Sequence, residues 1–107
     1  MKESEIQKQI IKYLELKKYC FWRNYVGPIL RGPTKRRSPN PMAGLPDIIG
    51  VLKSSPRMFV IEVKTKTGKL SEKQVVWLDK LNKAGALCIV ARTVAEVIDA
   101  FEMHDKV

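Results

Sequence analysis

The stretch Met58-Phe59-Val60-Ile61-Glu62-Val63-Lys64 decides the fold of this 107-residue chain. Its aliphatic and aromatic residues lie between a proline and a glycine, which is typical of a β-strand. Because side chains alternate between the two faces of a strand, Glu62 and Lys64 are predicted to share one face. The apolar residues beside them then turn to the other face. This strand is thus predicted to be polar on one side and to contribute to a core on the other.

A second apolar run, Asp47 to Leu52, precedes this strand and follows Gly44-Leu45-Pro46. Proline can open a strand but lacks the N–H that a central position donates, so Asp47 falls near the strand start. The turn around Lys53 to Pro56 is short enough for the two strands to pair as a hairpin. We therefore expect Asp47 to lie near Glu62.

Two carboxylates beside an ammonium group fit the hydrolysis of a phosphodiester. A divalent cation held by carboxylate oxygens offsets the charge of the phosphate and lowers the pKa of bound water. Asp47 and Glu62 are the predicted metal ligands, with the Val63 carbonyl as a third, and Lys64 would orient water or stabilise developing charge. The same residues also fit the solvated face of a sheet and an ordinary turn. Both interpretations stay open on these residues alone.

The segment Lys64 to Gln74 (KTKTGKLSEKQ) adds a glycine-containing basic loop and a helix start. Together with Gly-Leu-Pro-Asp and Glu-Val-Lys, it resembles the VRR-NUC family of the PD-(D/E)xK nuclease superfamily. The resemblance extends to the early helix with Glu5, to Phe21-Trp22-Arg23-Asn24 and to the strand after Ala84-Gly85. It therefore covers nearly the whole chain.

This resemblance implies a nuclease that depends on Mg²⁺ or Mn²⁺ and acts on DNA. The matching active-site positions are Glu5, Asp47, Glu62, Lys64 and Gln74, with Glu5 a metal ligand directly or through water. From the residues alone, Glu5 could instead complement a helix dipole. Gln74 could cap its helix by bonding the backbone of Ser71, and we do not expect one rotamer to serve both roles.

Positive charge favours an anionic partner. The chain has 20 Lys and Arg against 11 Asp and Glu, a net charge of +9, which suits phosphate contacts without distinguishing DNA from RNA. The segment Gly27 to Gly44 contains four prolines and no acidic residue, and we expect an irregular basic loop, although such segments are also often disordered. Trp22 and Tyr25 either stack on unpaired bases or pack within the protein. The predicted DNA-binding residues are Arg31, Lys35, Arg36, Arg37, Lys66, Lys69 and Lys73.

The remaining patterns predict three helices and two further strands. A capping box at Ser4 to Gln7 starts a helix that runs to about Lys17, and Tyr19 to Val26 is a predicted strand. A second box at Ser71 to Gln74 opens a helix, with Val75, Leu78 and Leu81 inward and Gly85 as its C-cap. The strand Ala86 to Ala91 and a helix capped by Thr93 complete the order αβββαβα. The helical crossover makes the Glu62 and Ala86 strands parallel.

We therefore expect a single α/β domain over residues 1–107, with a mixed sheet flanked by helices as in the restriction-endonuclease-like core. No apolar run approaches the roughly 20 residues that span a bilayer, so we expect a soluble, cytoplasmic protein. Cys20 and Cys88 form no zinc pattern and are expected to stay reduced, and His104 receives no role.

The predicted function is a metal-dependent DNA endonuclease that selects branched DNA, such as four-way junctions, with little base specificity. Symmetrical cleavage of two strands needs two active sites, so a homodimer is expected. We expect neither an organic cofactor nor a membrane partner. One alternative is a nuclease of the same fold that acts on simple duplex or single-stranded ends. The other is a non-catalytic basic module that binds DNA or RNA.

Overall fold

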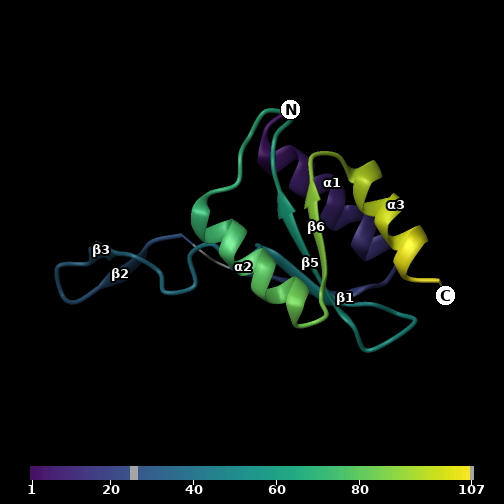
Figure 1. Cartoon of the computed structure of the whole chain (residues 1–107). Helices are drawn as coiled ribbons and strands as arrows, with labels where there is room; N and C mark the ends of the chain where they lie inside the picture. The colour runs from purple at the N-terminus through teal and green to yellow at the C-terminus, as the bar shows by residue number, and fades with distance from the viewer. Residues whose placement is uncertain (25–26, 107) are drawn as a thin grey trace.

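A four-stranded mixed sheet in the order β1-β4-β5-β6 forms the centre of the molecule (Figure 1). The computed structural model describes residues 1–24 and 27–106, so Tyr25 and Val26 of the first predicted strand lie outside the described residues. Its strands are β1 (Cys20–Arg23), β4 (Ile48–Val51), β5 (Met58–Val63) and β6 (Leu87–Ala91). β4 pairs antiparallel with β1 and β5, whereas β5 and β6 are parallel. The predicted fold class, hairpin and parallel pair are all confirmed.

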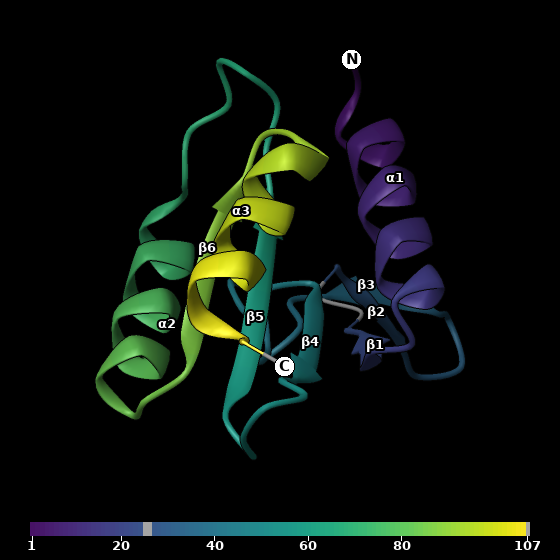
Figure 2. The same ribbon diagram turned by 90° about the vertical axis from the view of Figure 1, so that its right-hand side faces the viewer.

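Three helices cover this sheet. α1 (Glu3–Leu16) and α3 (Val94–His104) pack on one face, and α2 (Glu72–Lys83) packs on the other (Figure 2). Strand alternation explains this arrangement, because Ile61 and Val63 of β5 join the core beneath α1 and α3. Glu62, between them, turns toward α2.

The core fixes the position of β5. The side chains of Phe59 and Ile61 are fully buried, and the Phe59 ring lies 5.0 Å from the Phe101 ring of α3, centroid to centroid. A Cβ added at Gly50 would lie 2.3 Å from the Phe59 ring and 2.5 Å from the Cys20 carbonyl oxygen. Only glycine fits there, because the Phe59 ring and the backbone of β1 leave no room for a side chain.

Helix starts differ in how their end groups are satisfied. α1 begins at Glu3 with Lys2 as N-cap and no side-chain cap bond, so the predicted Ser4–Gln7 capping box is wrong. Ser4 lies inside the first turn, and the Gln7 amide bonds Asp47 instead. The predicted cap of α3 is confirmed, since Thr93 Oγ1 accepts a hydrogen bond from the Glu96 N–H at 3.3 Å.

One side of α2 is more exposed than expected. Leu78 and Leu81 are partly buried as predicted, but the side chain of Val75 is 51% exposed, so its inward placement is wrong. At about 100° per residue, the inward side of the helix centres on Gln74, Leu78 and Leu81, and Val75 falls roughly a quarter turn away. The helix ends at Lys83 with Ala84 as C-cap, so the predicted C-cap Gly85 is one residue too late; Gly85 follows Ala84 with φ 104°, a conformation that favours glycine.

The proline-rich segment is regular, contrary to the prediction. β2 (Ile29–Arg31) and β3 (Arg36–Ser38) form an antiparallel hairpin that projects from the body of the molecule (Figure 1). The prolines flank the strands or lie in the turn, where the missing N–H removes no ladder bond. We call Ile29–Ser38 the basic finger.

Other expectations concern single residues. Cys20 and Cys88 are free thiols, as expected, and His104 is exposed at the end of α3. Within residues 1–24 and 27–106, no helix has the length and apolar character needed to cross a membrane.

Candidate active site

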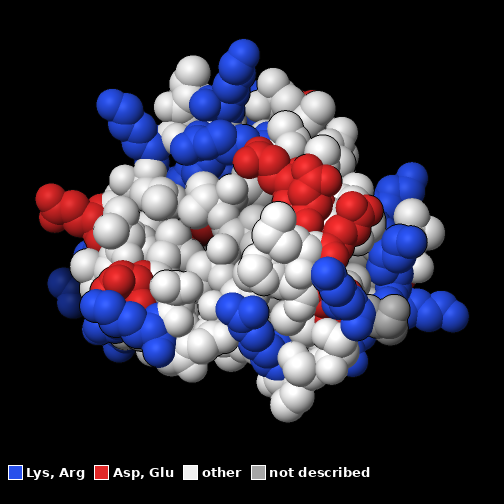
Figure 3. All heavy atoms as spheres, turned by 45° about the vertical axis from the view of Figure 1, so that its right-hand side comes forward, with Lys and Arg blue, Asp and Glu red and all other residues white. Residues whose placement is uncertain are grey.

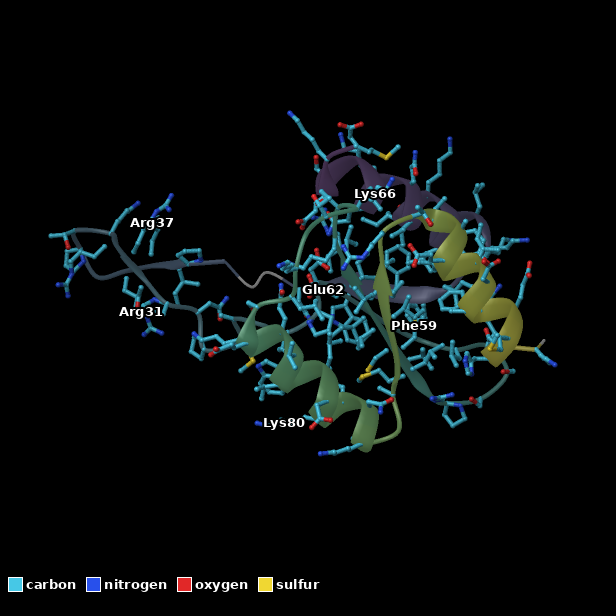
Figure 4. All side chains as sticks on the ribbon, turned by 45° about the horizontal axis from the view of Figure 1, so that its top comes forward. Arg31, Arg37, Phe59, Glu62, Lys66 and Lys80 are labelled. Atoms are coloured by element: carbon cyan, nitrogen blue, oxygen red, sulfur yellow. The ribbon has the colours of Figure 1, made fainter. Side chains whose placement is uncertain are left out.

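Asp47 and Glu62 face each other at one end of the β4–β5 hairpin. Ile48 pairs with Ile61, so the residues one step beyond, Asp47 and Glu62, are opposite and on the same side of the sheet. Only 5% of Glu62 is exposed, and Asp47 is partly buried. Figure 4 shows Glu62 inside the body, where β5 meets the α2 side.

Each carboxylate is held by one glutamine. Gln7 Nε2 of α1 donates a hydrogen bond to Asp47 Oδ2, and Gln74 Nε2 of α2 donates one to Glu62 Oε2 at 3.2 Å. Arg23 in turn donates to Gln7 Oε1 at 2.8 Å. The second oxygens, Asp47 Oδ1 and Glu62 Oε1, are buried and have no hydrogen-bond partner among the described residues. Two oriented carboxylates thus keep one acceptor oxygen each.

Gln74 serves both the site and its helix, contrary to the expectation that one rotamer could not. Its Oε1 accepts a hydrogen bond from the Ser71 N–H at 2.8 Å, and its backbone N–H donates to Ser71 Oγ at 3.2 Å. Its Nε2 remains for Glu62. The amide has an acceptor and a donor on opposite sides, so the capping box orients the bond to the carboxylate.

Burial raises the pKa of both acids, and the charge of Glu3 adds to the rise at each. Burial raises the pKa of Glu62 to about 7, the nearby charge of Asp47 adds to the rise, and Lys64 opposes it. The pKa of Asp47 is also raised by burial, although Arg23 and the Gln7 hydrogen bond pull it down. The pair therefore favours the uptake of positive charge, either a proton or a cation.

Lys64 follows β5 and is partly buried beside this pair. Its backbone N–H donates to the Ala91 carbonyl at 3.0 Å, which continues the parallel ladder. The loop after it is held by Arg92, whose guanidinium donates to the carbonyls of Thr65 at 2.5 Å and Gly68 at 2.7 Å. Sequence reasoning missed Arg92. The signal for it was the predicted parallel pair: β5 and β6 end side by side, so the residue after β6 lies near the loop after β5.

Glu5 is not brought to the pair. It is exposed, and at about 100° per residue it lies roughly 140° from Ile10 on the buried stripe. Glu3 and Gln7 share the side of α1 that meets the site: Gln7 bonds Asp47, and the charge of Glu3 raises the pKa of both acids. The described contacts give the role predicted for Glu5 no support. The helical spacing of the apolar residues was the signal for Glu3 and Gln7.

The predicted DNA-binding residues fall on two elements and a loop. In the view of Figure 4, Arg31 and Arg37 extend from the finger, and Lys66 lies across Glu62 from them. Acidic side chains gather near the middle of the face shown in Figure 3, where α3 comes forward, with Lys and Arg around them. All seven predicted cations come from segments outside α3: Arg31, Lys35, Arg36 and Arg37 from the finger, Lys66 and Lys69 from the loop after β5, and Lys73 from α2.

The donor set fits a hard cation. Asp47 Oδ1 and Glu62 Oε1 are buried, unpartnered oxygens in a site that favours positive charge, and oxygen is the ligand that Mg²⁺ and Mn²⁺ prefer. The described residues contain no group of three or more His, Cys, Asp and Glu side chains arranged for a metal. Further ligands would have to be backbone carbonyls or water, which is usual for Mg²⁺.

A mixed sheet flanked by helices, with two carboxylates and a lysine at one end of its central hairpin, defines the class of PD-(D/E)xK-like domains. The model of the VRR-NUC domain matches residues 1–95. The chain therefore belongs to the VRR-NUC domain family.

Relatives and a solved structure agree with this family. The chain is similar to Fanconi-associated nuclease 1 of Ailuropoda melanoleuca, with 41% identity over 73 residues, and to that of Homo sapiens, with 38% identity over 73 residues. Each alignment covers 64% of this chain but only 7% of the relative. A solved VRR_NUC domain protein is 18% identical and has a TM-score of 0.64, covering 97% of this chain and 88% of the other, which supports the fold.

Proposed function

We propose that this chain is a nuclease that hydrolyses phosphodiester bonds in DNA with Mg²⁺ or Mn²⁺. The observation that carries the proposal is the pair of buried, unpartnered oxygens, Asp47 Oδ1 and Glu62 Oε1, beside Lys64. A family of nuclease domains and relatives named as nucleases support the same activity.

Asp47, Glu62 and the Val63 carbonyl would hold the cation. When bound, the ion supplies charge neutralisation and an acidified water. The residues of the chain do the rest: Gln7 and Gln74 hold the carboxylates in place, and the Lys64 ammonium stabilises charge on the phosphate oxygens. On α1, the charge of Glu3 acts on the carboxylate pair. The family resemblance implies Glu5 as a metal ligand, directly or through water, and that assignment stays a prediction.

DNA is the proposed substrate, bound through its phosphates. The basic finger supplies exposed guanidinium groups, and within the described ranges none of Arg31, Arg36 and Arg37 pairs with an acidic side chain. Lys66 and Lys69 on the loop after β5 and Lys73 in the first turn of α2 add further positive charge. Selection for branched DNA and a homodimer with two sites on one junction are parts of this proposal that rest on the family resemblance and on symmetry.

The test compares wild-type protein with Asp47→Asn and Glu62→Gln on a panel of labelled DNAs: hairpin, flap, four-way junction and linear duplex. Wild-type protein should cleave with Mg²⁺ or Mn²⁺ and stop on addition of EDTA. Each variant should lose at least about a hundredfold in rate, because each removes a ligand charge while preserving shape. Binding to DNA in EDTA should be retained.

Two outcomes separate this proposal from the alternatives. Tight DNA binding without cleavage in either metal would identify a non-catalytic binding module. Equal cleavage of linear and branched DNA would support the nuclease activity and contradict the proposed selectivity.

Lys64→Ala should reduce the cleavage rate while metal binding, measured by calorimetry, is preserved, because an ammonium group is not a metal ligand.

A further inference from the structure

Two hollows adjoin between the finger and α2. The first is a groove of 280 Å³ lined by Arg31, Arg36, Arg37 and Ser38 of the finger and by Pro39, which follows it. The second is a cavity of 480 Å³ between the segment after the finger and α2. Pro39 lines both, so the two hollows are neighbours.

The groove is positive and lacks a counter-charge. Arg31 and Arg36 are directly opposite in the β2–β3 ladder, and like charges in that position repel each other. The segment 27–44 contains no acidic residue, and the described part of the chain offers these arginines no ion pair. A phosphate between the guanidinium groups would relieve this repulsion through paired N–H donors.

The cavity is mainly apolar, and a tryptophan is among its lining residues. Pro39, Pro41 and Ala43 line one side, and Val76 and Trp77 of α2 line the other, with Glu72 and Lys73 at the helix start. Its volume is within the range of small-molecule sites. An indole, two prolines and aliphatic groups make a surface on which a planar nucleobase can stack, and such stacking does not depend on sequence.

Each wall of the cavity belongs to a segment that also carries a residue of the proposed active site. The segment that forms the first wall runs on into Asp47, and it contacts α2 so closely that a Cβ on Gly44 would lie 2.6 Å from the Lys73 Cβ. On α2, Trp77 comes three residues after Gln74, which bonds Glu62, and residues at this spacing are neighbours on the helix surface.

We propose that these two hollows together bind one unpaired stretch of a nucleic-acid strand, with a phosphate in the arginine groove and a nucleobase against Trp77. This inference rests on the proposed function and names its substrate class: DNA with unpaired nucleotides beside the cleavage point. A strand has the required character, because its anionic backbone and its apolar base faces lie side by side. In a blunt duplex the bases are stacked within the helix and cannot enter the cavity.

The experiment uses two exposed valines as a matched pair. Val76 lines the cavity and is 50% exposed, whereas Val75 is 51% exposed and does not line it. Val76→Glu and Val75→Glu therefore add the same charge to the same helix, and both side chains can remain in solvent. Affinities are measured in EDTA for a short single strand, a flap and a blunt duplex, with thermal unfolding as a folding control.

Val76→Glu should weaken binding of the single strand and the flap roughly tenfold, because a carboxylate replaces an apolar group of the cavity wall and repels the anionic strand beside its stacked base. Val75→Glu should weaken it much less, and the blunt duplex should not distinguish the two variants. In a Trp22→Phe background, which leaves Trp77 as the single tryptophan of the sequence, the single strand should quench fluorescence and the blunt duplex should not.

Equal effects of the two variants on every DNA, or no quenching of Trp77, would overturn the proposal. A change of oligomeric state in Val76→Glu without any selective loss of DNA affinity would also overturn it, since the cavity would then hold a second copy of the chain. Because EDTA prevents metal-dependent cleavage, these results are independent of the nuclease assay. Selective binding of unpaired strands without cleavage in either metal would support the strand site and contradict the proposed nuclease activity.

Discussion

Glu62 is a buried carboxylate whose pKa is strongly raised by its surroundings. Burial raises its pKa from 4.5 to about 7, so the metal-free protein loses stability as pH rises through that interval. We predict that Glu62→Gln has no advantage over wild-type protein below about pH 4.5 and is more stable at pH 8 in EDTA, by on the order of 2–3 kcal/mol. Thermal unfolding at the two pH values measures this difference. A variant that is less stable than wild type at pH 8 would contradict it.

Two glycines with positive φ provide a second test at the residue scale. Gly44 has φ 95°, and a Cβ there would lie 2.8 Å from the Lys73 carbonyl carbon, whereas Gly32 has φ 74° and open space around it. Gly44→Ala should therefore cost both backbone strain and a clash, on the order of 2–4 kcal/mol, and displace Asp47. Gly32→Ala should cost only the strain, about 1 kcal/mol. Denaturant unfolding and cleavage rates of both variants check the prediction.

The sequence predicted those parts of the site that are local. The Asp47–Glu62 proximity follows from one short hairpin, and the Ser71–Gln74 cap follows from a four-residue pattern; the structure shows both. The facing side of α1 was predicted less well, because the resemblance favoured Glu5 over the helical spacing that places Glu3 and Gln7 toward the site. The second hydrogen bond of Gln74 depends on the distance between α2 and β5, which no local pattern contains.

At the scale of elements, the loop after β5 depends on the end of β6. Arg92→Ala should leave the carbonyls of Thr65 and Gly68 without their charged donor, which we expect to lower stability by about 1.5–3 kcal/mol. It should also slow cleavage, because the loop begins at Lys64. Arg57→Ala is the matched control: its guanidinium donates to the Gly85 carbonyl at 2.7 Å, away from the site. It should reduce stability but not the cleavage rate, and an equal loss of rate in both variants would refute the role given to Arg92.

The finger consists of two strands, β2 and β3, that the predicted order αβββαβα does not contain. A proline argues against a strand only at positions whose N–H donates to the ladder. The prolines of this segment lie before, between and after β2 and β3, and not within them. Sequence alone does not say which side of a proline a strand will occupy. The central strands were predicted correctly because β-branched residues and a buried face identify them independently of their neighbours.

At the scale of the whole molecule, we predict a homodimer in solution. The chain has one Asp47–Glu62 pair, and β1 is an edge strand with Trp22 47% exposed, so an apolar strand surface is available to a second copy. Light scattering at micromolar concentration, with and without four-way junction DNA, measures the assembly. Trp22→Lys should shift the balance toward monomer if β1 forms the interface, and a monomer under every condition would disprove the prediction.

The finger contacts mainly itself: its ladder joins β2 to β3, and the central sheet is complete without it. Its length and charge can therefore change without altering the packing around Phe59 or the positions of Asp47 and Glu62. During evolution, insertions and exchanges in this segment would be tolerated more readily than changes in the sheet. Homologous chains could thus acquire new substrates through the finger while inheriting one unchanged catalytic centre.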